Sequence, residues 1–574
     1  PRPPGEPMNT FADKIDMQNR LFAELSEMFG AEVPLYDRSL RVNRACNRTV
    51  CDLLAIAHPG FSITDELIEK TSGERHGAIR IGRPDEYRWI GRFFACFAME
   101  PHNFYDMANV GAKSQPIIAT AFRSSMNPEH RVFTSLLLTD YFDDATRGRI
   151  EALLAGRSVF SDKAKALIEK CESQGGLSHE DADALIREGT QRIFKWTGRA
   201  RDHDLYRHLC DAGFKIAADI ACFTSHHLNH LTPNTFCMDL YTAAMRFCMG
   251  ETDEAVLRDR AVLSLTRLGE RSDAHAMRLL FRHLTADDVA AFGHATPGAA
   301  QIAALVDSLV ARLKAPDMSM AGLRHSGFKD STEGPSEDTP VLLRQDAYKA
   351  LTEPVVFTNP DGSTVDTVHT ARFGEIEQRG YATTPAGRAL YDECLAEAET
   401  AKQRDPDLLK RDFAAYERKY AEAFARFPKN LEGLVAAGLV HARYEPTAAG
   451  VAAAGSIETT DLPALVELGF VRYEGLRYED FLPVSAAGIF ASNLNQYGTQ
   501  ATAASRPVYT QQDLERILGR PIVDAAALYR GMEADSILQT YEALGLTDRL
   551  PAETRRTLEH DAAPCRSLTT AMAG

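Results

Sequence analysis

Candidate metal ligands occur in three short segments of this 574-residue chain that lie far apart in the sequence. The first segment contains His76, the second has three histidines within 226–230, and the third contains Glu375 and Glu377. Two imidazoles and one carboxylate are the ligand set of a mononuclear non-haem Fe(II) site that keeps positions open for substrate and oxygen. If they bind one metal ion, the fold must bring these three segments together. The chemistry that this pattern predicts is metal-dependent oxidation.

Spacing within the last two segments decides which side chains point the same way. If residues 226–232 are extended, His226 and His230 lie on one face because side chains alternate along a strand. Glu375 and Glu377 also share a face, and two adjacent carboxylates are costly to bury without a cation. The alternative interpretations are a solvated edge strand for the third segment and a surface basic cluster for the first.

Motifs of other catalytic classes do not occur. The sequence has no CxxC spacing of a closed zinc site and no HExxH motif, so a zincin-type protease is disfavoured. It also has no GxSxG motif and no Walker A motif.

Composition restricts the partners and the compartment. The net charge of −16 and the pI of about 5.6 argue against nucleic acid, because phosphate binding needs a basic face. No apolar run approaches the length of a membrane span and no signal peptide is visible, so we expect no membrane partner. Ten scattered cysteines without a disulfide framework indicate a reducing, cytoplasmic location.

Hydrophobic periodicity predicts an α+β chain with a central mixed β-sheet flanked by many helices. Helical spacing begins at Asn9 and ends near Gly30, and residues 131–215 have the pattern of a run of amphipathic helices. The other predicted elements are one or two strands over 214–231, helices over 254–268, 273–284 and 298–313, strands over 341–357 and 370–382, and a turn at 359–363.

Three regions follow from this order of elements. They are a mainly helical region at 8–215 that carries His76 and Arg80, a metal-binding sheet core at 216–400 with a helical insertion at about 250–335, and a helical region at 401–574.

Five ordered motifs extend over most of the chain: Glu74–Arg80, Arg131–Leu137, His227–Pro233, Thr370–Gly380 and Tyr478–Ile489. Together they resemble the 2-oxoadipate dioxygenase/decarboxylase family, also called hydroxyglutarate synthases. The metal core of that family is similar to the vicinal oxygen chelate fold. Five motifs in the same order are far more specific than a single short pattern.

The resemblance implies roles for particular residues. The family's metal histidines fall on His76 and His230, which also border the substrate, and its catalytic, substrate-binding arginine falls on Arg80. The carboxylate ligand is Glu375 or Glu377. The strand is also similar to the last ligand strand of 4-hydroxyphenylpyruvate dioxygenase, where the glutamate lies three residues before a glutamine. That register favours Glu375.

The family's backbone contact with substrate falls on Val484 and Ser485. The resemblance further implies Fe(II) as cofactor and lysine catabolism as the physiological setting. The implied reaction converts 2-oxoadipate and O2 to 2-hydroxyglutarate and CO2, so the partners are a small 2-oxo dicarboxylic acid and O2.

Other functions are compatible with the same ligands. One is a related non-haem metal oxygenase that acts on another 2-oxo acid, and a second is a zinc or manganese lyase or hydrolase. A helical scaffold stabilised by an inert metal site is the non-enzymatic alternative. Iron content and oxygen uptake distinguish the oxygenases from the other classes.

Overall fold

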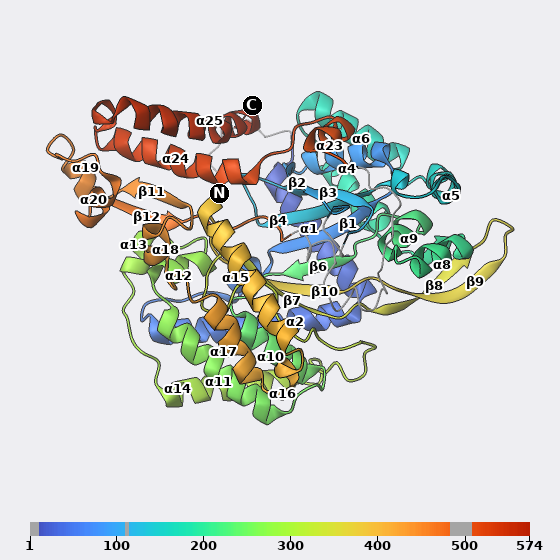
Figure 1. Cartoon of the computed structure of the whole chain (residues 1–574), viewed down its shortest axis with the longest axis horizontal. Helices are drawn as coiled ribbons and strands as arrows, with labels where there is room; N and C mark the ends of the chain where they lie inside the picture. Colours follow the sequence, from blue (N-terminus) through green and yellow to red (C-terminus); the bar gives the residue numbers. More distant parts are fainter. Residues whose placement is uncertain (1–10, 110–113, 483–507, 574) are drawn as a thin grey trace.

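A computed structural model describes residues 11–109, 114–482 and 508–573 of the chain. The predicted α+β class is confirmed: a mixed central sheet is flanked by many helices (Figure 1). Its strands run in the order β2-β3-β4-β1-β6, with β1 parallel to β4 and antiparallel to β6. The strands of this sheet are β1 (Arg75–Ile81), β2 (Glu100–Asp106), β3 (Ile117–Arg123), β4 (His130–Leu137) and β6 (His230–Pro233).

The helices that precede and follow these strands mostly begin at a side-chain cap, as at Asp13, Asp143, Ser161 and Ser178. They are α1 (Lys14–Glu32), α2 (Pro34–Ala57), α3 (Asp65–Ser72), α4 (Pro84–Ala95), α5 (Asp144–Ala155), α6 (Asp162–Gln174), α7 (His179–Glu188), α8 (His203–Asp211) and α9 (Lys215–Cys222). The predicted N-terminal helix corresponds to α1.

Two sequence predictions in this part were wrong. Residues 131–215 were expected to be helical throughout, but β4 extends to Leu137, and β2 and β3 were not predicted. Every residue of β3 and β4 is buried, so neither strand shows the alternation that reveals a half-exposed strand. Residues 214–231 were expected to be extended, whereas Lys215–Cys222 is a helix whose apolar side chains are buried on all sides.

A second, two-stranded sheet continues the first beyond β6. It pairs β10 (Gly374–Arg379) antiparallel with β7 (Leu343–Tyr348). Backbone hydrogen bonds from Phe373 N to Asn229 O (3.1 Å) and from Thr235 N to Glu377 O (2.8 Å) hold β10 beside the β6 segment. The side chain of Tyr348 packs where a Cβ at Gly374 would lie, so a larger residue at 374 would displace this ring.

The predicted turn at 359–363 is confirmed, but it joins β8 (Thr352–Thr358) to β9 (Thr364–Thr370). These two strands form a hairpin that extends from the body of the molecule and pairs with β5 (Arg199–Arg201) (Figure 1). The strand predicted over 341–357 is therefore two strands, β7 and β8. The segment predicted over 370–382 contains the end of β9 and the whole of β10.

Helices surround the second sheet and make up most of the remaining described residues. The predicted helices within 254–313 are confirmed as α11, α12 and α14. In chain order the helices are α10 (Met238–Cys248), α11 (Glu254–Arg271), α12 (Ala274–Leu280), α13 (Ala286–Ala290), α14 (Ala299–Leu313), α15 (Pro385–Arg404), α16 (Leu408–Arg411), α17 (Phe413–Ala423), α18 (Leu431–Ala436), α19 (Ala448–Ala452), α20 (Leu462–Glu467), α23 (Gln511–Leu518), α24 (Ala525–Ala543) and α25 (Ala552–Ala573).

The C-terminal part adds a small antiparallel pair, β11 (Ala442–Pro446) with β12 (Val471–Gly475). Helices α24 and α25 lie side by side, and α24 also packs on β11 (Figure 1). None of the helices in the described part of the chain contains an apolar stretch sufficient to span a bilayer.

Candidate metal centre

Neighbouring strands bring the three ligand segments together. In the pairing of β1 with β6, Ala78 lies opposite His230 and His76 lies opposite Thr232. Cross-strand partners point to the same face of a sheet, so His76 and His230 share one face. The adjacent strand β10 adds Glu375 on that face, where its Oε2 lies 3.3 Å from Oγ1 of Thr232.

His76, His230 and Glu375 form a compact group of candidate ligands. All three are buried, and one nitrogen or oxygen from each lies within 4.8 Å of the others. Nε2 of His76 lies 3.1 Å from Oε2 of Glu375, and Nε2 of His230 lies 3.4 Å from the same oxygen. The two imidazole rings are nearly perpendicular, with an angle of 89° between them.

The polar atoms of this group fit a divalent cation. Within the described part of the chain, neither ring nitrogen of His230 makes a hydrogen bond, and Oε1 of Glu375 also has no partner. A buried polar atom without a partner costs about 1–3 kcal/mol. A metal ion relieves that cost by accepting lone pairs from an imidazole and a carboxylate, and two histidines with one carboxylate suit iron, zinc and manganese.

Glu377 is fully engaged with other groups. Its carboxylate accepts two hydrogen bonds from Arg379 (2.8 and 2.9 Å), one from Arg131 (3.3 Å) and one from Nδ1 of His76 (2.6 Å). Burial alone would raise the pKa of Glu377, but Arg379, His76 and Arg131 outweigh it and hold this pKa well below its usual range. These contacts favour Glu375 over Glu377 as the carboxylate that faces the ion.

Electrostatics differ between the three candidate ligands. Burial raises the pKa of Glu375, against the opposing effect of His76. Burial and the nearby His76 and Arg80 hold the pKa of His230 well below its ordinary value. Burial would lower the pKa of His76, but Glu377 and Glu375 outweigh it and raise this pKa. His230 is therefore a neutral imidazole, which is the form that binds metals.

Only one histidine of the 226–230 cluster faces this group. Nε2 of His226 lies 3.2 Å from Oε2 of Glu86, which also accepts a hydrogen bond from Arg157 (2.7 Å). His227 lies 3.2 Å from Asp219. The segment before His230 is irregular, so the alternation expected for 226–232 does not apply there.

Arg80 lies on the same face of β1 as His76, four residues further along. Its Nη1 donates to Oδ2 of Asp219 (2.7 Å), and this is the only hydrogen bond that Arg80 makes within the described residues. Nε and Nη2 therefore remain available to an anion. Asp219 is also held by His369 at 3.1 Å, so the arginine has a fixed orientation.

Aromatic rings enclose the histidines. Phe481 packs against His76 with ring centroids 5.0 Å apart, and Phe373 packs against His230 at 4.7 Å. Both phenylalanines are about 1% exposed, so bulk water has little access to the imidazoles from these sides. The predicted substrate residues Val484 and Ser485 lie outside the described residues.

Three residues of the site were not singled out from the sequence. Arg379 lies two residues after Glu377, and a period-two reading of the strand could have placed it on the same face. Arg131 stands in a noted motif, but its link to Glu377 depends on strands that were not predicted. Asp219 lies in α9, which was misread as a strand, so no sequence signal connected it to Arg80.

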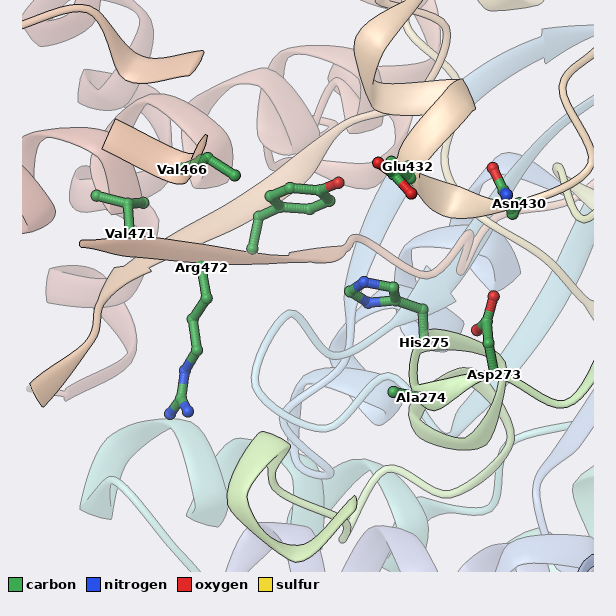
Figure 2. A pocket seen from close by; sticks show the side chains of 9 residues that line it. Asp273, Ala274, His275, Asn430, Glu432, Val466, Val471 and Arg472 are labelled. Carbon is green, nitrogen blue, oxygen red and sulfur yellow. The ribbon is translucent and has the colours of Figure 1, made fainter. Parts of the chain in front are cut away.

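Two cavities in the described part of the chain lie apart from this group. One, of about 390 Å³, lies between α12, α18, α20 and β12, where His275 and Arg472 are among the lining residues (Figure 2). The other, of about 120 Å³, includes Phe236 and Gln378 in its lining. Neither cavity is lined by a candidate ligand.

Comparison with known proteins places the chain in a family. Residues 21–250 and 278–493 match the model of the 2-oxoadipate dioxygenase/decarboxylase family. The chain is 32% identical over 550 residues to a 2-oxoadipate dioxygenase/decarboxylase of Pseudomonas putida, which covers 94% of this chain and 99% of the relative. It is 31% identical over 534 residues to the Escherichia coli protein of the same name, covering 92% of this chain and 97% of the relative.

A solved structure agrees with these sequence matches. The hydroxyglutarate synthase of Pseudomonas putida in complex with 2-oxoadipate superposes with a TM-score of 0.66 at 30% identity, covering 94% of this chain and 100% of that one. The chain therefore belongs to the 2-oxoadipate dioxygenase/decarboxylase family.

Proposed function

We propose that this protein is an Fe(II)-dependent dioxygenase that converts 2-oxoadipate and O2 to 2-hydroxyglutarate and CO2. The observation that carries the proposal is the buried group of His76, His230 and Glu375, in which His230 and one oxygen of Glu375 have no hydrogen-bond partner within the described residues. The reaction balances, because the atoms of one 2-oxoadipate and one O2 equal those of one 2-hydroxyglutarate and one CO2. The names of the relatives support the choice of substrate.

His76, His230 and Glu375 would hold the metal ion on one face of the sheet. Iron supplies, when bound, the redox chemistry with O2 that amino-acid side chains lack. A 2-oxo acid offers a carboxylate oxygen and a keto oxygen to such a site. Three protein ligands leave positions for both oxygens and for O2.

Glu377 acts on the metal through His76. With the Nδ1 proton of His76 donated to this carboxylate at 2.6 Å, the lone pair of Nε2 would bind the metal beside Glu375. A hydrogen bond of this kind fixes the tautomer and the orientation of a ligating imidazole. Arg379 and Arg131 keep Glu377 ionised and in place.

Arg80 binds the carboxylate of the substrate that lies away from the metal. The chain carries a net charge of −16, so a dianionic substrate needs a local cation. Nη1 of Arg80 is anchored by Asp219, and the remaining N–H groups present a planar edge to a carboxylate. None of the ten cysteines forms a disulfide within the described residues, and most are buried, which fits the reducing cytoplasm as the compartment.

Metal dependence and substrate range test the proposal together. Protein purified without metal is loaded with Fe(II), Zn(II) or Mn(II) and given a panel of 2-oxo acids in an oxygen electrode. We expect oxygen uptake only with Fe(II), and fastest with 2-oxoadipate. Turnover without oxygen uptake, or with Zn(II) alone, would instead indicate a lyase or hydrolase, and a faster rate with another 2-oxo acid would reassign the substrate.

A further inference from the structure

The buried polar atoms that lack a partner continue beyond the metal ligands onto the next strand. Gln345 in β7 is 1% exposed, and within the described residues both its amide nitrogen and its amide oxygen have no hydrogen-bond partner. Strand β10 lies between β6 and β7. His230 in β6, Glu375 in β10 and Gln345 in β7 are thus side chains with unsatisfied polar atoms on three neighbouring strands. A buried amide without hydrogen-bond partners is unfavourable, which indicates that this side chain binds a polar ligand.

Strand pairing places Gln345 on the face that carries the ligands. Gln345 lies opposite Glu377, and Ala347 lies opposite Glu375. Cross-strand partners share a face, so the amide of Gln345 points to the same side of the sheet as both glutamates. Ala347, the residue opposite Glu375, carries only a methyl group and therefore offers no hydrogen-bond partner to either side chain.

The backbone of Gln345 is fixed from both sides. Its N–H donates to the carbonyl of Glu333 (2.9 Å), and its carbonyl accepts from the N–H of Glu333 (2.8 Å), while β10 pairs along the other edge of β7. The direction of the side chain is therefore set by the sheet. An unpaired amide on a rigid strand is suited to binding, because the side chain loses little conformational entropy when a ligand binds.

The register separates Gln345 from Arg80. Arg80 lies four residues beyond His76 in β1, towards the end of that strand. Gln345 pairs with Glu377, and Glu377 in turn lies beside Asn234. Asn234 is two residues beyond Thr232, the residue opposite His76, in the direction away from Arg80. The metal ligands thus lie between the two side chains, both across the strands and along them.

We propose that Gln345 is a substrate-binding residue that donates from Nε2 to an oxygen of the 2-oxo acid group held at the metal ligands. Arg80 then serves the opposite end of the dicarboxylate. Gln345 is not assigned to the metal itself, because its strand neighbour is Glu377, which is saturated by Arg379, Arg131 and His76. This inference rests on the proposed function, since it takes a 2-oxo acid as the ligand.

Two substrates that differ only at the far end distinguish the two roles. 2-Oxohexanoate has the chain length of 2-oxoadipate but no second carboxylate. Loss of Gln345 weakens binding of both acids by the same factor, whereas loss of Arg80 weakens binding of 2-oxoadipate alone. A hydrogen bond to a charged group predicts a change of about 10- to 100-fold for Gln345→Met, which keeps the length of the side chain and removes its polar atoms.

The experiment is calorimetric titration of metal-loaded protein with both acids in the absence of oxygen, using wild type, Gln345→Met and Arg80→Ala. Metal content is measured for each protein, and we expect it to be unchanged. Equal weakening of both acids in Gln345→Met with full metal content supports the inference. Unchanged affinity for both acids would overturn it, since the amide would then bind water only, and the proposed function would stand.

Other outcomes are equally decisive. Weakening of 2-oxoadipate alone in Gln345→Met would place the amide at the far carboxylate and overturn the assignment to the oxo acid group. Metal loss in Gln345→Met would overturn the exclusion of Gln345 from the metal. Wild-type protein that carries metal and binds neither acid would overturn the proposed function and this inference together.

Discussion

His76 contacts two glutamates of one strand through its two ring nitrogens: Nδ1 lies 2.6 Å from Glu377, and Nε2 lies 3.1 Å from Glu375. The two carboxylates are chemically identical and two residues apart, yet their surroundings differ. Two arginines surround Glu377, whereas one oxygen of Glu375 has no partner in the described part of the chain. The sheet therefore places the two glutamates in different electrostatic environments.

This difference predicts opposite effects on metal content. We expect Glu375→Gln to lose iron and activity, because a neutral amide replaces the anionic ligand. Glu377→Gln should retain most of the iron but bind it about 10- to 100-fold more weakly, because the support of His76 is impaired. Iron per protein, measured by atomic absorption on matched preparations, checks both variants. Loss of iron in Glu377→Gln with retention in Glu375→Gln would reverse the assignment.

The histidine cluster gives a matched pair of substitutions. His230→Ala should abolish turnover and remove iron, whereas His226→Ala should keep iron and most activity. His226 contacts Glu86 rather than the ligands, so its loss should lower the free energy of unfolding by about 1–3 kcal/mol. Thermal unfolding and iron content of the two variants are the measurements. Equal iron loss in both would show that the wrong imidazole was chosen.

Substitution of Arg80 should weaken substrate binding without reducing the metal content. Arg80→Lys retains the charge but not the planar edge, so we expect a higher KM for 2-oxoadipate and slower turnover with iron still bound. Arg80→Ala should be worse, because it leaves a substrate carboxylate unpaired, and it also leaves Asp219 without this partner. Steady-state oxygen uptake checks both. Unchanged KM in Arg80→Ala would show that the arginine serves the structure alone.

His130 predicts a pH dependence of stability. Burial, assisted by Arg75, lowers its pKa from 6.5 to about 3 in the folded protein. Between these two pH values His130 is protonated in the unfolded chain but neutral in the folded chain. The stability contributed by neutral His130 is therefore fully present above about pH 6.5 and is lost as the pH falls towards about 3.

A variant without this titration isolates the effect. In His130→Asn the amide oxygen lies at the position of Nδ1 and can still accept the hydrogen bond that the Arg75 N–H donates there. The stability deficit of the variant relative to wild type should shrink by on the order of 2 kcal/mol between about pH 8 and about pH 5. Urea unfolding at the two pH values measures it. A deficit that stays constant or grows on acidification would contradict the depressed pKa.

The sequence was informative where chemistry requires rare residues. Two imidazoles and a carboxylate pointed to one ion although His76 and Glu375 lie in distant segments, and the structure brings both beside His230. The turn at 359–363 and helices α11 and α14 were also predictable, because turn residues and one-sided apolar stripes are local signals.

Prediction failed where local signals vanish. Strands β3 and β4 are buried on both faces, and α9 is buried on all sides, so neither shows a period. Asp219, the partner of Arg80, is on α9, and Arg131, one of the partners of Glu377, is on β4. Gln345 was not predicted as a site residue either, because its lack of hydrogen-bond partners arises from the packing of the sheet and has no signal in the sequence.

The fate of the two oxygen atoms tests the central proposal most directly. Fe(II)-loaded protein is given 2-oxoadipate under isotopically labelled dioxygen, and the product is analysed by mass spectrometry. The proposed reaction places one labelled atom in the new carboxylate of 2-hydroxyglutarate and the other in its hydroxyl group. Product that carries no label, or a reaction that releases CO2 without consuming O2, would contradict a dioxygenase.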